Sequence, residues 1–173
     1  MMIYRILAAL LEYPDQNLVD NLGEILQALD DSLDVSVDER ETVRAFIADW
    51  MLEDATERQA AYVQTFDMTP EHSLHLTHHL FGDDKNRGPA LIDLSEYYKG
   101  YGVEVAGNEL PDYLPLMLEF AGSQLDETGA QVFFSDAVKV LGVLGSNLEK
   151  AGSPYAPLVR LIENRGRLSC LTA

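Results

Sequence analysis

The sequence predicts an all-α fold, a single-domain bundle of about seven or eight helices. Apolar residues recur at spacings of three and four along most of the chain, as on one face of a helix. No segment shows the apolar and polar alternation of a half-buried strand. A chain of 173 residues, 47% of them hydrophobic, fits one domain that buries about 70% of the surface its unfolded chain exposes. We therefore expect one helical domain over residues 1–173.

The first expected helix lies in the apolar opening MMIYRILAALLEYP, residues 1–14. The segment is apolar enough to suggest a signal peptide, but it lacks the charged start and the small-residue cleavage site of one. We interpret it as a core helix. No apolar run in the chain reaches the length of about 18 residues that a membrane-spanning helix requires.

Three later segments show clear helical periodicity. The first is preceded by Ser36-Val37-Asp38-Glu39, a capping-box pattern that predicts a helix start. The apolar stripe of this helix consists of Val43, Phe46, Ile47, Trp50 and Met51. The stripes of the two later helices consist of Leu114, Met117, Leu118, Ala121 and Leu125, and of Phe134, Val138, Leu141, Leu144 and Leu148. Turn-forming residues at 13–14, 30–34, 69–70, 82–88, 100–108 and 152–154 separate the helices.

The charge balance restricts the partners of this chain. It holds 29 acidic and 12 basic residues, a formal net charge of -17. Such a surface repels the phosphates of nucleic acids and anionic membranes, and it attracts basic peptides. Residues 150–173 are the basic exception, and we expect a basic tail at 165–173 whose flexibility the sequence leaves open. Cys170 is the only cysteine, so no internal disulfide is expected and a reducing compartment is the simplest location.

The histidines of HSLHLTHH raise the question of a metal site. His72, His75 and His79 are spaced to share one helical face, and Asp83 and Asp84 follow. The spacing matches no defined zinc motif, so we expect no metal. A metal-dependent helical hydrolase that uses these histidines remains an alternative. The serines lack a nucleophile motif, and the sequence therefore favours a protein without catalytic activity.

Two loops rich in turn residues attract attention. GDDKNRGP, residues 82–89, lacks the residues of a phosphate-binding loop, and we expect Arg87 to pair locally and hold the loop. ELPDYLP, residues 109–115, precedes a predicted helix. Pro111 and Pro115 stiffen the entrance to that helix, and Asp112 is placed to cap it. Glu109 then offers a carboxylate that is free to meet a ligand.

These motifs together resemble a known family. LLEYPD (residues 10–15), the pair Phe66-Asp67, SLHLTHHLFGDDKNRGPALIDL (73–94) and ELPDYLPLMLEF (109–120) occur in the order and spacing of the NarJ family, nitrate reductase molybdenum-cofactor assembly chaperones. The resemblance implies an all-helical, non-catalytic cytoplasmic chaperone, akin to the TorD and DmsD group and without a cofactor of its own. Such a protein binds the N-terminal segment of the apo nitrate reductase catalytic subunit. It keeps that subunit competent for insertion of the molybdenum cofactor and the iron–sulfur clusters.

The resemblance also assigns individual residues. The positions that match the family pattern are His79, Gly82, Arg87, Gly88, Asp93, Glu109, Pro111, Asp112, Leu114 and Pro115. We expect Gly82, Arg87, Gly88 and Asp93 to structure the loop. The chain departs from the family at Tyr113, where a histidine is common, at Phe81, and at residues 84–86.

We predict a peptide-binding groove with an acidic rim. An amphipathic leader helix would place its apolar face between chaperone helices and its cations at the rim. The expected groove walls are Tyr62, Phe66, Tyr113 and Leu116, the expected rim acids are Asp67, Glu109 and Asp112, and His79 and Pro111 complete the predicted site. A generic acidic interaction module is a further alternative. The sequence leaves open whether the chain forms a homodimer.

Overall fold

The structure is a computed structural model that describes residues 1–82, 85–107 and 109–171, with side chains as far as residue 167. Its described residues form eleven α-helices and two short helical turns, and the all-α prediction is confirmed. The helices are α1 (Met2–Leu10), α2 (Gln16–Asp20), α3 (Leu22–Asp31), α4 (Val37–Trp50), α5 (Ala55–Tyr62), α6 (Leu76–Phe81), α7 (Arg87–Gly100), α8 (Leu114–Gln124), α9 (Glu127–Ser135), α10 (Val138–Lys150) and α11 (Ala156–Leu171). The π-helical turn η1 (Val63–Asp67) and the 3-10 turn η2 (Pro70–His72) connect α5 to α6.

The structure contains more helices than the sequence predicts because several breaks carry neither glycine nor proline. Asp54 starts α5 with a capping box, and the Asp126 side chain accepts a hydrogen bond from the Gly129 amide at the start of α9. The stripe from Phe134 to Leu148 is also divided, between α9 and α10. Polar caps end and start helices without a conspicuous turn motif, so these boundaries were missed.

Helices α1 and α8 form the centre of the molecule. The apolar opening is a core helix as predicted, with Ile3, Tyr4 and Leu7 fully buried. Gly122 allows the close approach of α8 to α1, because a Cβ at this position would lie 2.5 Å from Arg5 Cγ and 2.9 Å from the Met1 carbonyl oxygen. The contact between these two helices forms one wall of the site described below.

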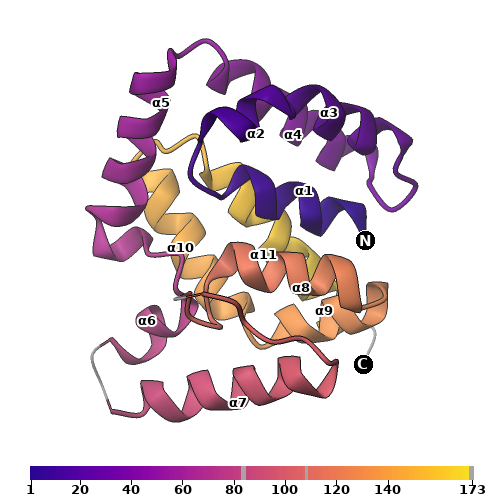
Figure 1. Cartoon of the computed structure of the whole chain (residues 1–173), viewed down its shortest axis with the longest axis vertical. Helices are drawn as coiled ribbons and strands as arrows, with labels where there is room; N and C mark the ends of the chain where they lie inside the picture. The colour runs from indigo at the N-terminus through magenta and orange to yellow at the C-terminus, as the bar shows by residue number, and fades with distance from the viewer. Residues whose placement is uncertain (83–84, 108, 172–173) are drawn as a thin grey trace.

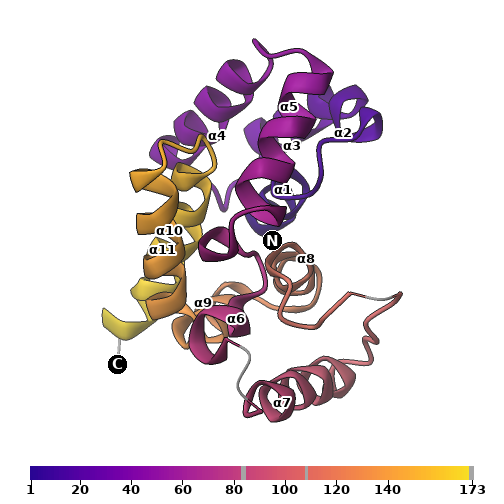
Figure 2. The ribbon, with the colours of Figure 1, turned by 90° about the vertical axis from the view of Figure 1, so that its left-hand side faces the viewer.

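The remaining helices surround this pair (Figures 1 and 2). Helices α10 and α11 pack against each other, and α9 packs on α11. Helix α7 lies at one end of the molecule in both views. Arg165, in the expected basic tail, is buried in α11 and donates to Glu39 Oε1 at 2.5 Å. None of the described helices is long and apolar enough to cross a membrane.

The capping box before α4 is confirmed, and it supports a first prediction. Ser36 Oγ accepts from the Glu39 amide at 3.3 Å, and the Glu39 carboxylate accepts from the Ser36 amide at 2.9 Å. Ser36→Ala removes the first acceptor, so we expect the free energy of unfolding to fall by about 1 kcal/mol in urea denaturation. Ser95→Ala, in the interior of α7, is the control and should not lower the free energy of unfolding. Equal stabilities for the two variants would refute the cap.

Candidate functional site

The motif ELPDYLP joins two distant parts of the chain. The Leu76 amide donates to the Asp112 carbonyl at 3.1 Å, and the Leu114 amide donates to the Leu74 carbonyl at 2.9 Å. These bonds form an isolated antiparallel bridge between His75 and Tyr113. Tyr113, the residue before α8, has extended backbone angles (φ = -68°, ψ = 118°), which allow it to pair with the segment that contains His75. The histidine-rich segment and the proline motif therefore form one structural unit.

Asp112 is the centre of this unit, and its predicted roles as a rim acid and as the cap of its own helix were wrong. The residue is 1% exposed. Its Oδ2 accepts from the Thr77 amide at 2.9 Å and from the Thr77 hydroxyl at 2.5 Å, so it caps α6 instead of α8. Burial raises the pKa of Asp112, but hydrogen bonds from His75 and Thr77 outweigh this and hold the pKa below its ordinary value. The Asp112 carboxylate is therefore engaged inside the protein, where Thr77, His75 and Arg87 lie against it.

Both ends of α7 are attached to the same motif. At the first end, Arg87 Nε donates to Thr77 Oγ1 at 2.9 Å, and the guanidinium lies 3.7 Å from Asp112 Oδ2. At the other end, the buried Tyr98 hydroxyl donates to the Pro111 carbonyl at 2.7 Å. Pro111 is itself buried. Thus two adjacent residues of the motif fix where α7 lies.

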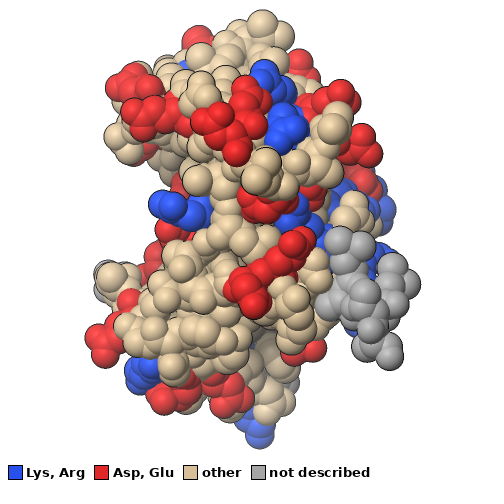
Figure 3. All heavy atoms as spheres, turned by 90° about the vertical axis from the view of Figure 1, so that its right-hand side faces the viewer, with Lys and Arg blue, Asp and Glu red and all other residues tan. Residues whose placement is uncertain are grey.

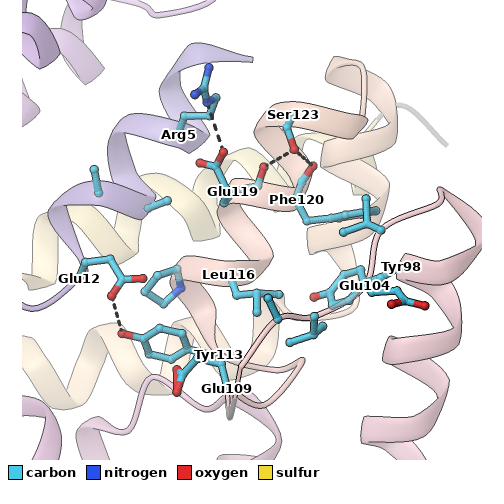
Figure 4. A pocket seen from close by; sticks show the side chains of 16 residues that line it. Arg5, Glu12, Tyr98, Glu104, Glu109, Tyr113, Leu116, Glu119, Phe120 and Ser123 are labelled. Carbon is cyan, nitrogen blue, oxygen red and sulfur yellow. Dashed lines mark hydrogen bonds and ion pairs between the residues drawn. The ribbon is translucent and has the colours of Figure 1, made fainter.

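Beside the motif, the structure has an open groove, here called the α1–α8 groove, with a volume of about 450 Å³. Figure 4 shows it between α1, α8 and the loop that follows α7. Its lining consists of Arg5, Ala8, Ala9 and Glu12; of Tyr98, Val103, Glu104, Val105, Ala106 and Glu109; and of Tyr113, Pro115, Leu116, Glu119, Phe120 and Ser123. Apolar side chains form most of its wall.

The charged residues of the groove are mainly acidic. Glu12, Glu104, Glu109 and Glu119 line it, and Arg5 is the one cation among its described lining residues. Arg5 lies 3.5 Å from the Glu119 carboxylate, so three glutamates remain without a basic partner in the groove. Figure 3 shows further acidic side chains at several places on one face of the molecule, among uncharged and a few basic ones. The groove can therefore accept a cation without introducing a repulsive contact.

Glu12 and Tyr113 close one end of the groove. The Tyr113 hydroxyl donates to Glu12 Oε2 at 3.2 Å (Figure 4). Partial burial raises the pKa of Glu12; the hydrogen bond from Tyr113 opposes this, and the charge of Glu109 adds to the increase. A cation placed between Glu12 and Glu109 would relieve this unfavourable interaction between like charges. These two carboxylates are the strongest candidates for a cation-binding subsite.

The predicted groove walls divide into two pairs. Tyr113 and Leu116 line the groove and are half-buried. The predicted rim acid Glu109 also lines the groove, and it is exposed. Tyr62 and Phe66, in contrast, lie in the core, 4% and 7% exposed, so their expected placement in a groove wall was wrong. Their rings pack on each other and on Tyr155. Burial of these two aromatic rings in the core is energetically favourable, because it removes a large apolar surface from water.

The other predicted residues lie outside the groove. Asp67 is exposed on η1, and Asp93 is exposed on α7. His79 is half-buried, its Nε2 lies 2.7 Å from the Ser73 carbonyl, and burial lowers the pKa of its imidazole. Gly82 has φ = 53°, a left-handed conformation that favours glycine at the end of α6. Gly88 lies in the first turn of α7.

The histidines do not converge. His72 Nδ1 lies 3.1 Å from the Thr65 carbonyl, His79 faces Ser73, and His75 faces Asp112. Among the described residues, no group of three or more His, Cys, Asp or Glu side chains could hold a metal ion. Asp83 and Asp84, the carboxylates of the hydrolase alternative, lie outside the described residues. The geometry thus offers the hydrolase alternative no support.

Sequence reasoning missed much of the groove. Glu12, Glu104, Glu119 and Phe120 line it although none was predicted to. Glu12 follows an apolar helix, and Phe120 is in register with the buried face of α8, so both resemble ordinary structural positions. Glu12 and Phe120 reach the same surface only because α1 packs on α8.

Comparisons with known proteins agree on one family. A family model described as the nitrate reductase delta subunit matches residues 15–160. The chain is 33% identical over 157 residues to the nitrate reductase molybdenum cofactor assembly chaperone NarJ of Escherichia coli strain K12, an alignment that covers 91% of this chain and 66% of that protein. It is 38% identical over 101 residues to the probable chaperone NarJ of Bacillus subtilis strain 168, which covers 58% of this chain and 54% of that protein.

A more distant match is the nitrate reductase-like protein NarX of Mycobacterium tuberculosis strain H37Rv. It is 26% identical over 164 residues, and the alignment covers 95% of this chain and 24% of that protein. The chain thus spans about two thirds of the length of the Escherichia coli relative and less of the other two. Glu109, Tyr113 and Leu116 lie within the matched residues 15–160.

Proposed function

Because this chain belongs to the nitrate reductase delta subunit family, we propose that it is a non-catalytic, cytoplasmic assembly chaperone for a nitrate reductase. It binds the N-terminal segment of the apo catalytic subunit and keeps that subunit competent for insertion of the molybdenum cofactor and the iron–sulfur clusters. The names of the relatives support the molybdenum cofactor assembly role. The α1–α8 groove supports the binding of a client segment.

The observation that carries the proposal is the combination of an apolar wall with three glutamates that lack a basic partner within the groove. An amphipathic helix that carries a lysine or arginine complements both features. Its apolar face packs against Leu116, Pro115 and Phe120, and its cation lies between Glu12 and Glu109. A flexible leader must order when it binds, which costs several kcal/mol and keeps the affinity moderate. Moderate affinity suits a chaperone that must release its client.

The two kinds of contact should contribute unequally. One large apolar side chain that becomes buried contributes about 1.5–3 kcal/mol, whereas an exposed ion pair contributes about 0–1 kcal/mol. The apolar wall should therefore determine the affinity. The glutamates should mainly increase the association rate and orient the leader.

Peptide binding by groove variants tests this proposal. The probe is a synthetic peptide of the first 15 or so residues of the nitrate reductase catalytic subunit from the same genome, titrated by calorimetry. Leu116→Glu puts a charge in the apolar wall and should weaken binding about 10- to 100-fold. Glu109→Lys should weaken it about fivefold at low salt and less at high salt.

Asp67→Lys is the matched control for Glu109→Lys, because it makes the same charge change at an exposed acid outside the groove. We expect it to change the affinity less than about twofold. Equal affinities for the wild type, Leu116→Glu and Glu109→Lys would refute the groove as the leader site. A full loss of binding by Asp67→Lys would place the site elsewhere on the surface.

A further inference from the structure

We propose that a second cleft, the α7 cleft, docks an amphipathic helix of a partner protein that carries at least one lysine or arginine. The cleft has a volume of about 480 Å³ and lies between the inner side of α7 and helices α6, α8, α9 and α10. It is separate from the α1–α8 groove. The proposal goes beyond the leader-binding function and does not depend on it.

The attachment of α7 at its two ends gives the cleft its form. Arg87 holds the first end on Thr77 and Asp112, and Tyr98 holds the other on Pro111. Between these anchors, Ala90, Asp93 and Leu94 of α7 line the cleft. The middle of α7 is thus one wall of the cleft, and α9 and α10 supply the opposite wall.

Large apolar side chains at the mouth of the cleft are left in solvent. Leu80 is 59% exposed, Val132 is 58% exposed and Tyr97 is 40% exposed, and all three line the cleft. They come from α6, α9 and α7, three different helices that surround one opening. Apolar residues gathered around one opening are typical of an interaction surface, in contrast to scattered single ones.

The charges of the cleft indicate the kind of partner. Asp93 and Asp136 line it and are exposed, and neither carboxylate makes a hydrogen bond or an ion pair with a described residue. No basic side chain is among the described lining residues. A second copy of this chain, with its net charge of -17, would place these aspartates against further acidic surface. Charge complementarity therefore favours a basic partner segment over self-association.

A wall of aromatic rings separates the two sites. Tyr98 and Phe120 line the α1–α8 groove, whereas Tyr97 and Phe133 line the α7 cleft. The ring centroids of Tyr98 and Phe120 are 4.6 Å apart, and those of Phe120 and Phe133 are 5.5 Å apart. The two sites are thus adjacent but open on opposite sides of this wall. Variants in one can be made without altering the lining of the other.

A model peptide tests the cleft directly. The probe is a 15-residue, dye-labelled amphipathic helix of leucine, lysine and alanine, and its binding is followed by fluorescence anisotropy. All proteins carry Leu116→Glu, which blocks the α1–α8 groove. Adding Val132→Glu, at an exposed position in the cleft, should weaken binding at least about tenfold. Adding Leu33→Glu, at a fully exposed position on no cleft lining, is the control and should change nothing.

A second pair of variants keeps the test independent of the apolar change. Asp93→Asn with Asp136→Asn should weaken binding about threefold or more at low salt and reduce its salt dependence. A peptide of the same composition with scrambled leucine positions should bind at least about tenfold more weakly. Binding unchanged by Val132→Glu and by the double asparagine variant would overturn the proposal. So would a dimer, measured by light scattering, that Val132→Glu dissociates, because the occupant would then be a second copy.

Discussion

Replacing Asp112 with alanine should lower the free energy of unfolding by about 3 kcal/mol or more. The change removes the acceptor of the Thr77 amide and hydroxyl, both of which are buried in the folded protein. It also leaves Arg87 without its nearby carboxylate. Because these groups connect α6, α7 and the entrance of α8, their loss should destabilise the whole region and not a single helix end.

Urea denaturation monitored by circular dichroism measures this effect. Asp67→Ala is the matched control, since it removes an exposed aspartate and should change the stability by no more than about 0.5 kcal/mol. If Asp112→Ala unfolds at the same urea concentration as the control, Asp112 is not a structural anchor. Its interpretation as a ligand-binding acid would then return.

The pH dependence provides a second check on Asp112. Its pKa in the folded protein is lowered, while the pKa in the unfolded chain is about 3.9. A lowered pKa contributes stability that is present above the unfolded value and is lost as the pH falls through the folded value. The stability difference between the wild type and Asp112→Ala should therefore be present above about pH 4 and shrink as the pH falls below that value.

Replacing Gly166 with valine should lower the free energy of unfolding by about 2–3 kcal/mol. A Cβ at this position would lie 2.9 Å from the Phe134 carbonyl oxygen and 2.9 Å from Val138 Cγ2. The first of these atoms belongs to the backbone, so α11 would have to move away from α9. The gain in helix propensity over glycine, about 0.5 kcal/mol, offsets only part of this cost.

Gly23→Val is the matched control for Gly166→Val. Gly23 also lies in a helix, α3, but a Cβ there would meet nothing within 4 Å. We expect its stability to stay within about 0.5 kcal/mol of the wild type. Thermal denaturation of the two variants compares them directly, and equal melting temperatures would contradict the close packing of α11 on α9.

The sequence predicted the helical elements where local signals are strong. The capping box Ser36–Glu39 and the stripe that contains Val43, Phe46 and Trp50 correctly located α4. Such signals are local, because a helix is closed by bonds between residues four apart. The boundaries at Asp54 and Asp126 were missed, although both residues are good N-caps. Aspartate is common in this acidic chain, and most of its copies cap nothing.

The candidate site was only partly predictable. The proline motif correctly drew attention to Glu109, Tyr113 and Leu116, which line the α1–α8 groove. The same motif misled on Asp112, because a partner 35 residues away in the chain, Thr77, takes its carboxylate. Tyr62 and Phe66 were predicted to be groove walls, whereas both lie in the core. No local sequence pattern distinguishes an aromatic side chain that is buried in the core from one that lines a binding groove.

By itself the sequence determined the helical class, the acidic character and the family resemblance, since these depend on composition and on short-range spacing. Only the tertiary structure decided which acidic side chains lie at an open surface, where they can bind a ligand, and which are buried. That choice depends on contacts between segments far apart in the chain, such as α1 with α8 and Thr77 with Asp112. Whether a carboxylate is desolvated and bonded or left at an open surface follows from those contacts, and its charge can serve binding only in the second case.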